Sequence, residues 1–253
     1  MDMKVTENLN IHSKYVLLKL TTQDGSVIPD AVPGQFVEMR VDKEPKTFLR
    51  RPISINYIDK EKNELWLLIQ KIGAGTVKLS QAKPGDTINI IHPLGNGFSY
   101  PVDGQKELLL TGGGVGVAPL LYLGSELKKR GYKPVFLLGA RTKGDLLQID
   151  DFKAISDTYV TTEDGSDGEK GFVTQHSILQ KRKFDMIYCC GPRPMMEAVA
   201  KHAYATSTEC EVSLENMMAC GIGACLCCVE DTTEGNVCVC KEGPVFNIKK
   251  LQW

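Results

Sequence analysis

Residues 217–240 of the chain read MMACGIGACLCCVEDTTEGNVCVC, and this stretch contains six of the nine cysteines in the sequence. Between the first two of these cysteines lie two glycines and an alanine. Small residues let a loop wrap closely around a bound group and direct the backbone N–H groups of the loop inward. The stretch therefore predicts a disulfide cluster, a structural zinc site or an iron–sulfur cluster. Four of these cysteines, considered next, are Cys220, Cys225, Cys228 and Cys240.

The spacing of these four cysteines favours the iron–sulfur cluster. Four residues separate Cys220 from Cys225, two separate Cys225 from Cys228, and eleven precede Cys240. The pattern C-x4-C-x2-C…C is typical of plant-type [2Fe–2S] ferredoxins. We expect Cys220, Cys225, Cys228 and Cys240 to be the ligands, with Cys238 as the alternative to Cys240.

A structural zinc is the alternative metal site. Zinc usually takes two short ligand pairs, which Cys225 and Cys228 could form with Cys238 and Cys240. That arrangement leaves Cys220 and its glycine-rich loop without a role.

Composition disfavours the disulfide cluster and several kinds of partner. The 253 residues include 30 basic and 31 acidic side chains, so no charge excess indicates nucleic acid or an anionic membrane as a partner. The N-terminal residues lack the pattern of a signal peptide, and no apolar run is long enough to cross a bilayer. We expect a soluble cytoplasmic protein, in which clustered cysteines bind metal or do redox work rather than form structural disulfides. Nine cysteines would also leave one thiol unpaired.

The first part of the chain, residues 1–102, reads as a small antiparallel β-barrel. Short runs such as YVLLKL, QFVEMRV and ELWLLIQKI are rich in β-branched, aromatic and aliphatic residues, and turn formers such as DGS, PGQ and KPGD separate them. No helical pattern intervenes. This spacing of strands is typical of a barrel or sandwich.

The second part, residues 103–210, alternates strands with helices. ELLLTG and PVFLLGA read as buried strands, and VAPLLYLGSELKKRG between them reads as a helix. Apolar strands alternating with helices predict a parallel sheet covered by helices. Residues 211–253 form the predicted third, cysteine-rich domain.

Two segments at predicted strand ends indicate nucleotide binding. TGGGVGVAPL (111–120) lies where a strand meets a helix, a place where backbone N–H groups receive phosphate, although a run of glycines can also be a tight turn. YCCGPRPMMEAV (188–199) lies at the end of a later strand. Because ligands of parallel sheets bind at the carboxyl ends of the strands, the two segments together favour a nucleotide site.

The predicted barrel contains a basic strand, LRRPISI (49–55). The Arg51 guanidinium suits a pyrophosphate because it is planar and permanently charged, and the Ser54 hydroxyl can donate a hydrogen bond to a ring nitrogen. The alternative is an edge strand with solvated arginines, because proline interrupts strand pairing.

With barrel, sheet and cysteine segment in this order, the chain resembles the ferredoxin–NADP reductase superfamily over essentially its whole length. RPIS (51–54) is similar to the superfamily's flavin motif, and LIQ (68–70) and GAGT (73–76) are similar to its second flavin-binding strand and loop. The most specific piece, MACGIGACLCCVE with VCVCKEGPVF, resembles the cluster domain of the dihydroorotate dehydrogenase branch. That similarity favours Cys240, the cysteine directly before KEGPVF, over Cys238.

The resemblance implies three bound groups, FAD, a [2Fe–2S] cluster and NAD(H). It implies no general acid or base in this chain, with electrons passing between the nucleotide, the flavin and the cluster. The acidic stretch TTEDGSDGEKG (161–171) further favours NADH over NADPH, because carboxylates repel a 2′-phosphate, although a solvated acidic loop would also explain these charges. The residues implied to bind FAD are Arg51, Pro52, Ile53, Ser54, Leu68, Ile69, Gln70, Gly75 and Thr76. Those implied to bind the nicotinamide nucleotide are Gly112, Gly113, Gly114, Gly116, Cys190, Gly191 and Pro192.

The resemblance also implies a partner chain. We find no FMN site and no base for C–H deprotonation in the sequence, so the substrate chemistry is expected on an FMN-containing dihydroorotate dehydrogenase catalytic subunit, in an assembly with two copies of each chain. The product would serve pyrimidine (UMP) biosynthesis. Two alternatives stay open at this point: a reductase subunit of another NAD(P)H-linked complex, linked to a hydrogenase or a ferredoxin, and a zinc-stabilised nucleotide-binding protein.

Overall fold

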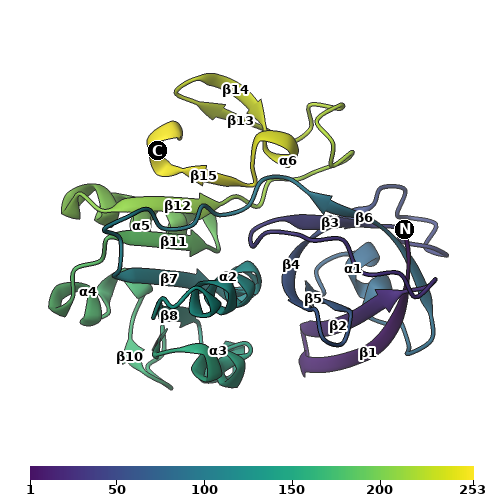
Figure 1. The fold of residues 1–253 in the computed structure, drawn as a ribbon, viewed down its shortest axis with the longest axis horizontal. Helices are drawn as coiled ribbons and strands as arrows, with labels where there is room; N and C mark the ends of the chain where they lie inside the picture. Colours follow the sequence, from purple (N-terminus) through teal and green to yellow (C-terminus); the bar gives the residue numbers. More distant parts are fainter. The chain divides into compact units, whose positions relative to one another are not determined.

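The computed structural model describes residues 1–253, and the first part of the fold is a closed antiparallel barrel (Figure 1). The strands follow the order β1-β2-β5-β4-β3-β6 around the barrel, and alternate side chains such as Leu18, Ile55 and Leu67 fill its core. The expected barrel is therefore confirmed, but the expectation that no helix intervenes is wrong, because a short helix lies between β5 and β6. Its elements are β1 (Asp2–His12), β2 (Tyr15–Thr22), β3 (Phe36–Met39), β4 (Arg51–Asp59), β5 (Glu64–Gln70), α1 (Ala74–Leu79) and β6 (Thr87–Leu94).

The second element is a seven-stranded sheet in the order β10-β9-β8-β7-β11-β12-β15. All neighbouring pairs are parallel except β12 and β15, which pair antiparallel. The expected parallel α/β domain is confirmed, with three strands that the sequence did not predict, β10, β12 and β15. The strands are β7 (Leu108–Gly113), β8 (Val135–Ala140), β9 (Thr158–Thr162), β10 (Glu169–Lys170), β11 (Met186–Cys190), β12 (Glu209–Ser213) and β15 (Val245–Asn247).

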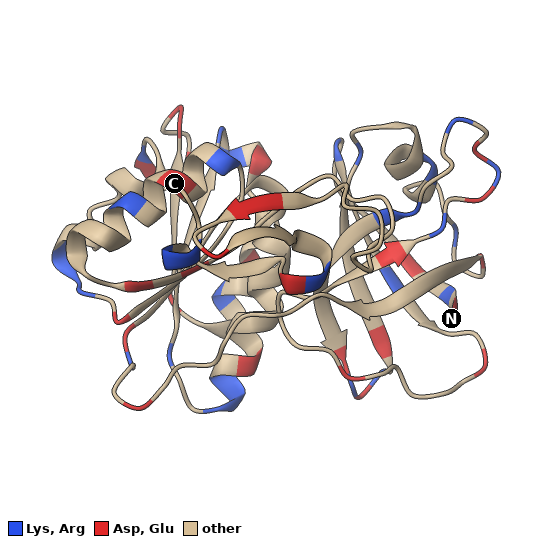
Figure 2. Ribbon diagram, turned by 90° about the horizontal axis from the view of Figure 1, so that it is seen from above, with Lys and Arg blue, Asp and Glu red and all other residues tan.

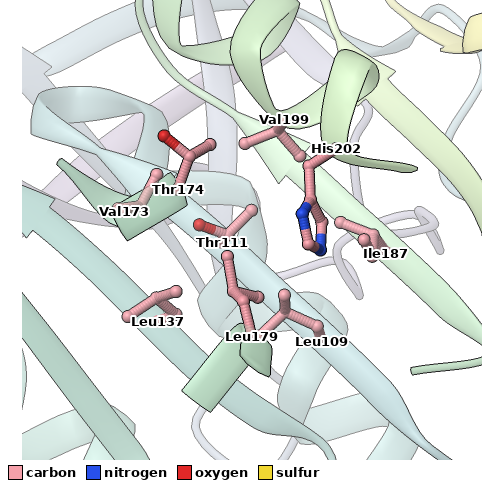
Figure 3. A pocket seen from close by; sticks show the side chains of 9 residues that line it. All are labelled: Leu109, Thr111, Leu137, Val173, Thr174, Leu179, Ile187, Val199 and His202. Carbon is pink, nitrogen blue, oxygen red and sulfur yellow. The ribbon is translucent and has the colours of Figure 1, made fainter. Parts of the chain in front are cut away.

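Helices cover both faces of this sheet. Phe136 of β8 meets Gly124 of one helix and stacks edge-on against Phe152 of another, at a ring-centroid distance of 4.9 Å. The opposite face carries Thr111 and its neighbours under Val199 of a third helix, around a small apolar cavity (Figure 3). The helical segments are η1 (Gly114–Val117), α2 (Ala118–Lys129), η2 (Lys143–Asp145), α3 (Ile149–Ile155), η3 (Val173–Gln175), α4 (Ile178–Lys181) and α5 (Arg193–Thr206).

The cysteine-rich segment is divided between two compact units. Residues 216–230 and 236–244 group with residues 1–97, whereas residues 231–235 and 245–253 group with residues 98–215. The predicted limits 1–102, 103–210 and 211–253 stay predictions. The remaining elements are β13 (Val229–Thr232), β14 (Gly235–Cys238), α6 (Val239–Glu242) and η4 (Ile248–Lys250).

The distribution of charged residues and the length of the helices are the last two features of the fold. Figure 2 shows basic and acidic residues interspersed in both units. None of the helices combines the length and the apolar character that crossing a bilayer requires.

Candidate functional site

The expected flavin strand forms the first half of β4. Arg51, Pro52, Ile53 and Ser54 are half-buried and pair antiparallel with β3, so that Arg51 lies opposite Met39 and Ser54 opposite Phe36. Pro52 lies opposite Glu38 of β3, whereas the pairing of β4 with β5 begins only at Ile55. This half of β4 therefore has one unpaired edge, as the alternative of an edge strand expected. Half-buried polar groups on a barrel strand are available to a ligand.

The loop before α1 approaches this strand closely. A Cβ atom added to Gly75 would lie 2.7 Å from Arg51 Nε and 3.1 Å from Thr47 Cγ2, so a larger residue at this point would displace the Arg51 side chain. Thr47 is buried, and its hydroxyl has no hydrogen-bond partner in the protein. A cradle of backbone, a guanidinium and an unpartnered hydroxyl fits the pyrophosphate of FAD. Sequence reasoning missed Thr47 because the segment that connects β3 to β4 carries no recognisable motif.

Other predicted flavin residues have structural roles. Leu68 and Ile69 are buried in the barrel core, so only their backbone groups could meet a ligand. Gln70, at the end of β5, is half-buried. The Thr76 hydroxyl accepts hydrogen bonds from the backbone N–H groups of Ile72, at 3.0 Å, and Gly73, at 3.2 Å, and thereby closes the turn before α1.

The two predicted nucleotide segments meet at the carboxyl edge of the parallel sheet. β7 and β11 pair so that Gly112 lies opposite Cys190. A Cβ atom added to Gly116 would lie 2.5 Å from Gly191 Cα and 2.6 Å from the Cys190 carbonyl oxygen. One added to Gly113 would lie 2.7 Å from the Met195 sulfur. The glycines thus let two backbone segments approach within contact distance.

Gly114 and Pro192 complete these segments. Gly114 has a φ of +57°, a conformation that favours glycine, and it opens η1 directly after β7. Pro192 precedes α5 and lies at the same edge, where its Cδ would be 3.6 Å from a Cβ atom added to Gly113. A turn of this kind presents backbone N–H groups to an anion.

One acidic residue at this edge escaped the sequence analysis. Glu215 follows β12, whose Ser213 lies opposite Cys190. Burial raises the pKa of the Cys190 thiol well above its ordinary value, and the Glu215 carboxylate raises it further. Although the Glu215 residue is partly exposed, protein packed around its carboxyl raises the pKa of that group also. The rule that ligands bind at the carboxyl ends of parallel strands could have singled out Glu215.

The four predicted cluster ligands form two pairs. The Cys220 thiol is hydrogen-bonded with that of Cys225, and the Cys240 thiol with that of Cys228. The Cys240 backbone N–H also points at Cys228 Sγ, at 3.3 Å. No three or more His, Cys, Asp or Glu side chains converge as a ready set of metal ligands. Two thiolates for each of two irons nevertheless fit a [2Fe–2S] cluster better than a single tetrahedral zinc.

Backbone N–H groups of the glycine-rich loop point at the sulfurs. The N–H of Gly223 donates to Cys240 Sγ at 3.0 Å, and that of Ala224 donates to Cys220 Sγ at 3.3 Å. Hydrogen bonds lower the pKa of the Cys220 thiol to about 6, and the backbone of Ile222 makes the largest contribution to this shift. Donors of this kind stabilise thiolates and tune a bound cluster.

The remaining cysteines of the segment lie outside these pairs. Cys227 is exposed. Cys238 is half-buried, and its thiol makes only a weak contact of 3.9 Å with the Gly223 carbonyl oxygen. The buried Cys240 is therefore better placed than Cys238 to be the fourth ligand.

Two family profiles match the chain. The profile described as the iron–sulfur cluster binding domain of dihydroorotate dehydrogenase B matches residues 215–252. The profile described as the oxidoreductase NAD-binding domain matches residues 110–201.

Curated relatives are similar along almost the whole chain. The dihydroorotate dehydrogenase B (NAD(+)) electron transfer subunit of Lysinibacillus sphaericus (strain C3-41) is 42% identical over 234 residues, which are 89% of each chain. The subunit of the same name from Geobacillus kaustophilus (strain HTA426) is 38% identical over 250 residues, covering 95% of this chain and 96% of the relative.

Solved structures share the fold. An NADH-dependent reduced ferredoxin-NADP oxidoreductase, described for flavin-based electron bifurcation, aligns with a TM-score of 0.87 at 30% identity and covers 99% of this chain and 90% of its own. Phthalate dioxygenase reductase aligns with a TM-score of 0.69 at 16% identity, covering 95% and 94%, and supports the fold alone.

The close approach at Gly75 generates a prediction. We expect Gly75→Ala to weaken FAD binding about tenfold, roughly 1.4 kcal/mol, because the added methyl group displaces the Arg51 side chain. Gly73→Ala is the matched control, since no atom lies within 4 Å of a Cβ atom there. Titration of the apoprotein with FAD measures both variants. Equal FAD affinity in the two variants would remove Gly75 and Arg51 from the flavin site.

Proposed function

Because this chain belongs to the family of dihydroorotate dehydrogenase B (NAD(+)) electron transfer subunits, we propose that it relays electrons between NAD(H) and a catalytic partner subunit. The resemblance to the ferredoxin–NADP reductase superfamily is confirmed by these relatives and by the shared fold. The relatives' name includes NAD(+), which supports NAD(H) as the nucleotide, in agreement with the acidic stretch at 161–171.

One structural observation carries this proposal. Residues 216–230 and 236–244, which carry all the cysteines of the segment, belong to the same compact unit as the barrel, with Gly221 packed against Glu38 of β3. β3 pairs directly with Arg51–Ser54 of β4. A cluster held at Cys220 would therefore lie close to a flavin held at β4, as an electron relay requires.

When bound, the nucleotide supplies hydride chemistry, FAD links two-electron to one-electron chemistry, and the cluster carries single electrons. The residues of the chain bind and orient these groups. Arg51 and Thr47 would hold the FAD pyrophosphate beside Gly75, and the Ser54 hydroxyl would donate a hydrogen bond to the flavin ring. The backbone at Gly112–Gly116 holds the nucleotide phosphates, while Cys190 and Gly191 border the nicotinamide. No side chain serves as a general acid or base.

The ligands proposed for the cluster are Cys220, Cys225, Cys228 and Cys240. The hydrogen bonds from Gly223 and Ala224 to two of these sulfurs support the assignment. Hydrogen bonds from backbone N–H groups to negatively charged thiolates are charge-assisted, and they replace the water that would otherwise solvate the thiolates.

The proposed partner is an FMN-containing dihydroorotate dehydrogenase catalytic subunit, in an assembly with two copies of each chain. The cluster segment carries exposed apolar side chains at Met217, Ile222 and Leu226, which are 85%, 59% and 66% exposed. Large exposed apolar residues close together in sequence mark an interaction surface. Met218, by contrast, is half-buried and packs within the protein.

A ferredoxin-linked reductase subunit is the second candidate. The structural similarity to the NADH-dependent reduced ferredoxin-NADP oxidoreductase favours it. The two candidates share the nucleotide, flavin and cluster sites and differ only in the partner.

The ligand assignment predicts different effects of two neighbouring cysteines. We expect Cys240→Ser to remove or strongly alter the EPR signal of the reduced cluster and to lower the iron content. Cys238→Ser is the matched control and should leave both nearly unchanged. The reverse pattern would make Cys238 the fourth ligand, and one zinc in place of iron would exclude the cluster.

The relay itself is tested by separating the two half-reactions. We expect the isolated chain to oxidise NADH with artificial dyes and to show no dihydroorotate oxidation. Adding an FMN-containing dihydroorotate dehydrogenase subunit should couple NAD⁺ reduction to orotate formation. Ile222→Asp or Leu226→Asp should weaken this coupling at least tenfold and spare dye reduction, because a buried charge opposes docking. Dihydroorotate oxidation by this chain alone would contradict the relay, and coupling to a ferredoxin alone would favour the second candidate.

A further inference from the structure

Glu38 is a fully buried carboxylic acid on the barrel strand next to the proposed flavin strand. It is 0% exposed, and neither of its carboxyl oxygens has a hydrogen-bond partner. All residues of β3 are buried, so Glu38 occupies a position where an apolar side chain would cost less. A buried, unpartnered carboxyl group points to a role beyond packing.

The outer face of β3 lies under the cysteine segment. Side chains of Phe36 and Glu38 share this face because successive side chains of a strand alternate. A Cβ atom added to Gly95 would meet both Phe36 and Pro244, and one added to Gly221 would meet Glu38. The side chains of β3 therefore connect the barrel to the cysteine loop.

The Glu38 carboxyl lies directly against the backbone that follows Cys220. A Cβ atom added to Gly221 would be 2.6 Å from Glu38 Cγ and 2.9 Å from Oε1. Gly221 also has a φ of +70°, so glycine is required here for both space and conformation. On its other side, Glu38 lies opposite Pro52 of the flavin strand.

The two nearby arginines bind other groups. Arg50 donates to the backbone oxygens of Glu38 and Asn89, at 3.2 and 3.1 Å, and to Asn89 Oδ1 at 2.6 Å. Arg51 donates to the Leu49 and Arg50 carbonyl oxygens, at 3.1 and 3.0 Å. Neither guanidinium forms a hydrogen bond with the Glu38 carboxyl, so no direct ion pair neutralises it. Burial raises the pKa of this carboxyl to about 7, so it carries its charge at mildly alkaline pH.

We propose that Glu38 is a positioning residue whose negative charge lowers the reduction potential of a [2Fe–2S] centre held at Cys220. The inference rests on the proposed function. Net charge, hydrogen bonds and solvent exposure around a cluster set its potential. A carboxylate in a buried site interacts with an added electron more strongly than an exposed one, because less water screens it.

The test compares two glutamates in the chain loaded with FAD and cluster. Glu38→Gln keeps the shape of the side chain and removes its charge, and Glu61→Gln removes a charge from an exposed turn of the same unit. EPR-monitored redox titration at one mildly alkaline pH gives the cluster potential. At the wild-type midpoint we expect the ratio of reduced to oxidised cluster to rise at least threefold in Glu38→Gln and to stay unchanged in Glu61→Gln.

Further variants separate the possible outcomes. Glu38→Asp should keep the wild-type potential, since the charge remains. Full cluster content with an unchanged potential in Glu38→Gln would overturn the inference, as would equal shifts in Glu38→Gln and Glu38→Asp. If Glu38→Gln loses the cluster, Glu38→Met is titrated in its place, and cluster loss in both variants would overturn the inference by making Glu38 necessary for assembly. A wild-type chain that lacks any [2Fe–2S] signal would instead refute the proposed function.

Discussion

The packing of Gly221 against Glu38 is the contact on which the arrangement of the redox sites depends. It fixes the first turn of the cysteine loop on β3, and β3 carries the pairing with Arg51–Ser54 on its other edge. Only glycine fits there, because the space is filled and φ is positive. Loop and barrel strand therefore form one structural piece, and the distance between the sites proposed for the flavin and the cluster is set by a packed barrel rather than by a flexible tail.

The site proposed for the nucleotide, at the sheet edge of the other unit, also depends on glycine. Gly116 and Gly191 come from segments far apart in sequence, and their backbones touch where side chains would clash. The strand β15 then returns the chain to the sheet after the cysteine segment. Each proposed site is built from at least two chain segments, and in each a glycine makes the close contact between them.

Much of this fold could be predicted from the sequence, because its signals are local. Alternation of apolar residues marked the barrel strands, strand–helix alternation marked the sheet, and cysteine spacing marked the cluster segment. The surroundings of Thr47 and Glu38 could not be predicted, since they depend on which segments meet in three dimensions. Local periodicity also gave no sign that β15 joins the sheet, because three residues are too few for a pattern. The positions assigned to individual ligand residues stay predictions.

The measurement that tests the electron relay most directly is an anaerobic titration of the isolated chain with NADH, followed by flavin absorbance and by EPR of the cluster. Relay through neighbouring sites in one unit predicts that NADH bleaches the flavin and that the reduced-cluster signal appears in the same titration, without a partner chain. A flavin that NADH reduces fully while the cluster stays oxidised, at potentials where dithionite reduces it, would contradict the relay.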